Sequence, residues 1–149
     1  MMTVVSVLVA VLVFASVPPL GAEEVTIVGR DFTFDAPAVL PAGRTAFVFE
    51  NPGQVRHEMI IALLRHGVTE QQIQDAHQAG IPFRKQMEQF VDDGELLGIL
   101  LARPRKTSSG KLLVDLVRGR TYLIICQQED PQGMPRHNVL GMYRTFRVE

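Results

Sequence analysis

The segment TYLIICQQEDPQGMPRHNVLGMYRTFRV, residues 121–148, decides the fold class of this 149-residue chain. Its two ends, 121–126 and 142–148, are rich in β-branched and aromatic residues, which predicts two strands. The polar stretch between them, with its prolines and glycines, predicts a loop at one end of a sheet.

The loop and its borders carry three side chains that can bind a metal. Cys126 ends the first strand, His137 lies in the loop, and Met142 begins the second strand. Cys126 is the only cysteine, so an internal disulfide is excluded. A buried structural thiol is the commonest alternative explanation for a lone cysteine, and its neighbours must decide.

The rest of the chain also reads mainly as short strands. Apolar and β-branched runs separated by turn residues predict strands at 25–29, 31–35, 45–50, 57–64, 96–101 and 111–117. Short strands with turns between them indicate a mainly β fold, an antiparallel Greek-key sandwich. His57 begins the strand HEMIIALL, just after the turn Asn51-Pro52-Gly53, and alternation puts His57 and Met59 on one face and Glu58 on the other.

A helical insertion interrupts the strands over about 69–93. Thr69 and Gln72 resemble a capping box, and Ile73, Ala76 and His77 share one helical face, which predicts a helix over about 70–79. Gly80 and Pro82 end it, and a second short helix is predicted over about 83–91.

The first 22 residues predict a signal peptide. They contain no charged side chain, and their apolar core of fourteen residues is too short for a membrane-spanning helix, which needs about 20. We therefore expect a mature domain over 23–149 that is periplasmic or otherwise exported. An uncleaved N-terminal anchor is the alternative, and it would be the only contact with a membrane.

Composition excludes several classes of protein. The chain has 15 basic and 16 acidic residues, a formal net charge of −1, so no nucleic-acid binding is expected. It is 46% hydrophobic, which is enough for one packed domain and excludes a disordered chain.

Four ligands of one kind of metal centre can meet at one end of this sandwich. Two imidazoles (His57 and His137), one thiolate (Cys126) and one thioether (Met142) are the set used for blue copper, where the methionine is a weak axial ligand. Copper would keep Cys126 deprotonated and protect it in an oxidising compartment. Met134, in the same loop, is the alternative axial ligand.

These segments resemble the cupredoxins, the blue copper family that includes plastocyanin and azurin. DFTFDAPAVLPAGRTAFVFENPGQVRHEM is similar to the N-terminal half of the family, TYLIIC to its cysteine strand, and PQGMPRHNVLGM to the stretch before its second histidine and methionine. The resemblance covers most of 25–149 and implies one type 1 copper ion held by His57, Cys126, His137 and Met142. The ten residues between Cys126 and His137 make a longer loop than in the best-known members.

The resemblance implies an electron carrier rather than an enzyme, working as a monomer with a redox protein as partner. A copper carrier or delivery protein and a copper-free interaction module are the alternatives. His66 and His77 lie on or near the helical insertion, where we expect solvated or capping side chains and no part in the metal site. For Glu58 we expect a side chain directed away from the metal.

Overall fold

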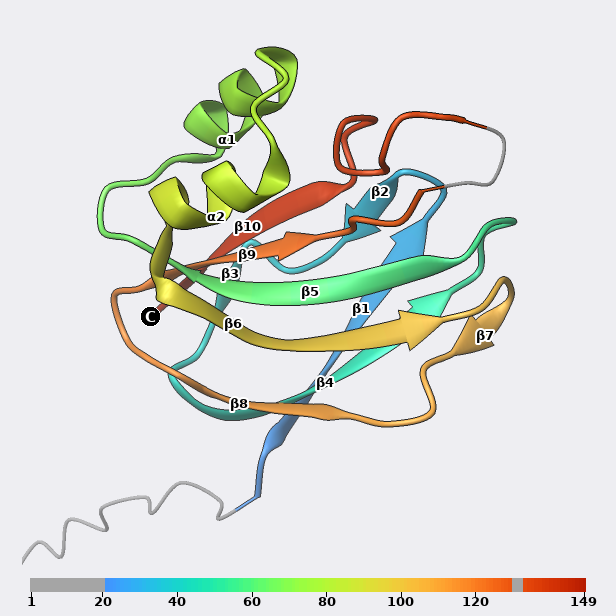
Figure 1. Ribbon diagram of the computed structural model, residues 1–149. Helices are drawn as coiled ribbons and strands as arrows, with labels where there is room; N and C mark the ends of the chain where they lie inside the picture. The colour runs from blue at the N-terminus through green and yellow to red at the C-terminus, as the bar shows by residue number, and fades with distance from the viewer. Residues whose placement is uncertain (1–20, 130–132) are drawn as a thin grey trace, which may run out of the picture.

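The chain folds into two β-sheets packed face to face, with two helices outside one of them (Figure 1). The computed structural model describes residues 21–129 and 133–149. The first sheet contains β1 (Glu23–Arg30), β2 (Thr33–Asp35), β4 (Gly43–Asn51), β7 (Lys106–Thr107) and β8 (Leu112–Leu116). The second contains β3 (Val39–Leu40), β5 (His57–Leu64), β6 (Val91–Ala102), β9 (Thr121–Ile125) and β10 (Tyr143–Val148).

The strand order confirms the predicted sandwich. The sheets run β2-β1-β4-β7, with β8 also on β4, and β3-β10-β9-β5-β6. Most pairs are antiparallel, but β1 pairs with β4, and β3 with β10, in parallel. The first parallel pair arises because the chain crosses to the second sheet at β3 before it returns beside β1, and parallel neighbours need such a crossover.

The main core lies between the two sheets. It is built from inward-facing aromatic and aliphatic side chains, among them Phe47 and Phe49 of β4 and Ile61 of β5. Tyr122 and Phe146, on paired strands, stack with their ring centroids 5.2 Å apart. Burial of these large rings, at about 25 cal/mol per Å² of apolar surface, holds the sheets together.

The helices cover the outer face of the second sheet. Ile60, Ala62 and Leu64 of β5 point outward and form a second cluster with Ile73 of α1 (Glu70–Gln78) and Phe90 of α2 (Phe83–Phe90). Strand β5 is therefore buried on both faces, which explains why its sequence is an unbroken apolar run.

The helix signals in the sequence are confirmed. Thr69 caps α1 in a capping box: its hydroxyl accepts a hydrogen bond from the Gln72 N–H, and the Gln72 side chain accepts one from the Thr69 N–H. The predicted end of the insertion was too late, because β6 begins at Val91 and is much longer than the predicted 96–101 strand.

Two N-terminal predictions have different outcomes. The predicted strand 31–35 is interrupted, because Phe32 has φ of 67° and forms a turn between β1 and β2. The predicted leader lies almost entirely outside the described residues. Within 21–129 and 133–149, no helix is long and apolar enough to cross a membrane.

Candidate metal centre

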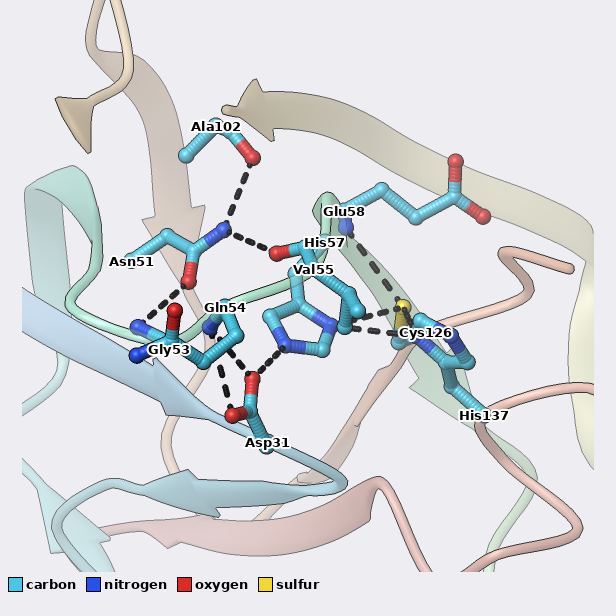
Figure 2. A network of polar contacts seen from close by, with 10 residues as sticks. All are labelled: Asp31, Asn51, Gly53, Gln54, Val55, His57, Glu58, Ala102, Cys126 and His137. Carbon is cyan, nitrogen blue, oxygen red and sulfur yellow. Dashed lines mark hydrogen bonds and ion pairs between the residues drawn. The ribbon is translucent and has the colours of Figure 1, made fainter. Parts of the chain in front are cut away.

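Two imidazoles and one thiol meet at one end of the sandwich (Figure 2). The Nδ1 atoms of His57 and His137 are 3.0 Å apart, and the Cys126 Sγ atom lies 4.0 Å from the first and 3.5 Å from the second. All three side chains are fully buried. The structure thus brings together both histidines and the cysteine predicted from the sequence, although the two histidines are 80 positions apart.

The sheet itself places two of the donors. His57 is the first residue of β5 and Cys126 follows the last residue of β9, and these strands are antiparallel neighbours with Ile60 opposite Ile125. The start of one strand therefore lies beside the end of the other. His137 arrives from the loop, whose backbone is held by a hydrogen bond from the His137 N–H to the Gln128 carbonyl, 3.0 Å.

The donor separations suit a three-coordinate metal ion. Bonds of about 2.0 Å to nitrogen and about 2.3 Å to sulfur, the lengths known for zinc, place the donors of a flat trigonal centre about 3.5 Å (N to N) and about 3.7 Å (N to S) apart. The separations of 3.0, 3.5 and 4.0 Å differ from these by about 0.5 Å or less. A thiolate with two neutral imidazoles is a donor set that copper prefers.

Asp31 orients His57, and sequence reasoning missed it. Its Oδ1 atom lies 3.3 Å from the His57 Nε2 atom, on the opposite side of the ring from Cys126 (Figure 2). Burial acts to raise the pKa of Asp31, but hydrogen bonds from the Gln54 and Val55 N–H groups and from His57 outweigh it and lower that pKa. A carboxylate that accepts a hydrogen bond from Nε2–H keeps the proton on that nitrogen, which leaves the Nδ1 lone pair to a metal.

Glu58 supports the cysteine without facing it. Its backbone N–H points at the Cys126 Sγ atom at 3.5 Å, while its carboxylate turns away, as Figure 2 shows. That carboxylate accepts hydrogen bonds from the Gln127 N–H and the Gln128 side chain, both at 2.9 Å. The predicted direction of Glu58 is consistent with this arrangement, and the side chain holds the two residues that follow the thiol.

Asn51 ties the turn before His57 to the sheets. Its Nδ2 atom donates to the Val55 carbonyl at 2.8 Å and to the Ala102 carbonyl at 3.0 Å, and its Oδ1 atom accepts from the Gly53 N–H at 2.9 Å. Such hydrogen bonds restrain the loop that carries His57.

An aromatic ring covers both histidines. The Phe32 ring meets His137 edge-on with centroids 5.0 Å apart and His57 edge-on at 6.3 Å. Phe32 has a left-handed backbone, with φ of 67°, and for this reason it does not continue a strand. The apolar ring limits access of water to the imidazoles.

Met142 is placed beside the centre by its backbone. It is fully buried, its N–H donates to the His137 carbonyl at 2.9 Å, and its carbonyl accepts from the Cys126 N–H at 3.1 Å. Met134, the alternative axial ligand, is 39% exposed. Burial favours Met142 for a role in the interior, and axial ligation stays a prediction.

The other two histidines lie elsewhere. His66 is exposed, as expected for a solvated side chain. The expectation of a solvated or capping role for His77 was wrong: it is buried, with its ring 4.8 Å from that of Tyr143. The signal was its position on the helical face of Ile73 and Ala76, which packs on the sheet.

A two-sheet sandwich with a buried histidine, cysteine and histidine at one end has the architecture of the cupredoxins, and comparison with solved structures shows that fold. An auracyanin from the photosynthetic bacterium Roseiflexus castenholzii is 18% identical, over 87% of this chain and 99% of that one, with a TM-score of 0.52. Auracyanin B is 20% identical, over 89% and 93%, with a TM-score of 0.53. No protein-family model matches the sequence, and no curated protein matches it at a significant level.

Proposed function

We propose that this chain is an exported electron-transfer protein with a single type 1 copper centre. The observation that carries the proposal is the convergence of two Nδ1 atoms and one thiol, all fully buried, at the end of a β-sandwich. Copper bound there would supply one-electron chemistry, and its ligands would be His57, Cys126 and His137, with Met142 as the weak axial ligand.

The protein's own groups are arranged to keep such a site rigid. Asp31 holds the His57 ring from behind, and Glu58 holds the residues after Cys126. The Glu58 N–H hydrogen bond to sulfur stabilises the thiolate and draws electron density from it. A site held in this way changes little in geometry between oxidation states, which favours fast electron exchange.

Burial favours electron transfer over copper delivery. A delivery protein must pass its ion to another set of ligands, which requires exposed donors. Here the three donor side chains have no exposed surface, and the Phe32 ring meets both imidazoles edge-on. An electron crosses a short protein barrier without any such exchange.

The surface beside His137 suits a redox protein as partner. Val139 is 52% exposed and Leu140 is 37% exposed. Both follow His137 in the loop between β9 and β10, which we call the ligand loop. Exposed apolar side chains next to a redox centre allow a partner to approach closely while water is removed. The uncharged apolar leader over 1–22 supports export.

Addition of Cu(II) to the purified chain tests the proposal. We expect an intense visible band from the copper–thiolate bond in the wild-type protein, no such band in Cys126→Ser, and an unchanged band in the control His66→Ala. A colourless wild-type protein that is folded by circular dichroism would contradict a type 1 centre. Rapid loss of copper to a chelator would favour delivery instead. Intact mass of the secreted protein, expected to begin near Glu23, tests export separately.

A further inference from the structure

The helical insertion and the ligand loop enclose a pocket outside the metal centre. Figure 1 shows α1 and α2 on the same side of the molecule as the loop after β9. The pocket has a volume of about 480 Å³ and is lined from the insertion by His77 and Gln86 and from the loop by Gln127, Arg136 and Asn138. A neighbouring hollow of about 440 Å³ shares His77 and Asn138 with it.

Four buried polar side chains line this pocket with hydrogen-bonding atoms that have no partner among the described residues. These atoms are Gln86 Oε1, Gln127 Nε2, Asn138 Oδ1 and both ring nitrogens of His77. The side chains are 2% to 8% exposed. A buried polar atom without a partner costs about 1–3 kcal/mol, so four such residues around one cavity indicate that something else completes their hydrogen bonds.

The hydrogen bonds that two of these amides do make fix their orientation. Gln86 donates from Nε2 to the Ile81 carbonyl at 2.6 Å, so its oxygen is the atom left as an acceptor. Gln127 accepts from Arg136 through Oε1 at 3.5 Å, so its Nε2 group is left as a donor. The pocket therefore offers both kinds of group.

His77 adds a neutral group to the pocket. Burial lowers the pKa of His77, and the side chain of Gln86 raises it by a smaller amount. No hydrogen bond of normal geometry joins these two side chains. A neutral imidazole has one donor and one acceptor nitrogen. The two arginines in the described lining, Arg84 and Arg136, are already paired with Glu88 and Glu129. A guest that only accepts hydrogen bonds, such as a carboxylate, would therefore meet unfavourable lone pairs at Gln86 and Asn138 without a free cation among the described lining residues to offset them.

We propose that this pocket binds a small uncharged molecule whose hydroxyl or amide groups both donate and accept hydrogen bonds. Its volume lies within the range of about 300–1,000 Å³ typical of small-molecule sites. The described pocket lining contains none of the proposed metal ligands, although Gln127 and Asn138 directly follow Cys126 and His137 in the chain. Ordered water filling the cavity is the competing explanation, and it predicts no saturable binding of such molecules.

Titration of the full chain loaded with copper and reduced to diamagnetic Cu(I), followed by amide chemical shifts in NMR, tests the proposal. The probes are glycerol and glucose for hydroxyl groups, acetamide for amide groups, and acetate as the charged counterpart of acetamide. We expect saturable shifts centred on Gln86 and Asn138 with a polyol or with acetamide, and none with acetate.

Variants connect the binding to the pocket. Gln86→Leu removes an acceptor and should weaken binding about tenfold, the effect of about 1.4 kcal/mol. Gln89→Leu is the matched control, because Gln89 is an exposed residue of the same helix outside this pocket, and it should leave affinity unchanged. If Gln86→Leu does not fold, His77→Phe removes polar atoms while it keeps a ring against Tyr143.

Three results would overturn the proposal. The first is the absence of saturable shifts with all three neutral probes, which would leave water as the occupant. The second is equal affinity in wild type and in the folded pocket variant. The third is tighter binding of acetate than of acetamide, which would show that charge, and not paired donors and acceptors, governs the site.

Discussion

Replacement of Asn51 by alanine should destabilise the fold by about 3 kcal/mol. Asn51 is 1% exposed and makes three hydrogen bonds, to the Val55 carbonyl, the Ala102 carbonyl and the Gly53 N–H. Alanine leaves these three groups without their partner. A buried group that loses its hydrogen-bond partner costs about 1–3 kcal/mol. We apply the lower limit to each of the three groups, because water is expected to recover part of the loss at Val55, and this gives about 3 kcal/mol.

Urea unfolding of the copper-free protein, followed by circular dichroism, measures this change. Gln54→Ala is the control in the same turn, because the Gln54 side chain is exposed and contacts Arg105 at the surface, so the change should be within about 0.5 kcal/mol. A loss below about 1 kcal/mol for Asn51→Ala, with an unchanged denaturant dependence, would refute the reasoning that this side chain holds the turn before His57.

Three further changes test the metal centre and the insertion. Met142→Leu should keep its copper and its colour. Its reduction potential, measured by voltammetry, should rise, because a thioether stabilises the oxidised copper ion more than the reduced one. An unchanged potential in Met142→Leu together with a shifted potential in Met134→Leu would show that Met134 is the axial ligand. Asp31→Asn keeps an oxygen for His57 but removes a negative charge, so the potential should rise by tens of millivolts; a fall would contradict this electrostatic account. Burial lowers the pKa of His77 below its ordinary 6.5, so the unfolded chain binds a proton at this residue more readily than the folded protein does. The free energy of unfolding should therefore fall as the pH falls from about 7 to 5, and it should fall less in His77→Gln than in the wild type. Equal falls in the two proteins, measured by urea unfolding at each pH, would show that His77 is not responsible.

Local sequence patterns determined the elements of this protein well. The capping box at Thr69 and Gln72 predicted where α1 begins, since its hydrogen bonds involve residues three apart. Apolar and β-branched runs predicted most of the longer strands, but β6 begins at Val91, five residues before the predicted 96–101 strand. The short strands β3 and β7, of two residues each, carry no periodicity and were not predicted.

The candidate ligands could also be named from the sequence, because a thiol, imidazoles and thioethers are few in this chain. Residue type alone leaves few combinations once a sandwich with one loop-rich end is assumed. The supporting residues could not be found in this way. Aspartate and glutamate are common, and nothing local distinguishes Asp31 or Glu58 from other acidic residues.

Tertiary structure decided the contacts between distant segments. Asp31 reaches His57 across 26 positions, and Glu58 reaches Gln127 across 69. The same holds for the parallel pairing of β1 with β4 and for the burial of His77, whose ring lies against that of Tyr143 in β10. Local periodicity reports which face of an element is apolar, whereas the partner of that face depends on how the chain crosses between sheets, and only the folded structure contains that information.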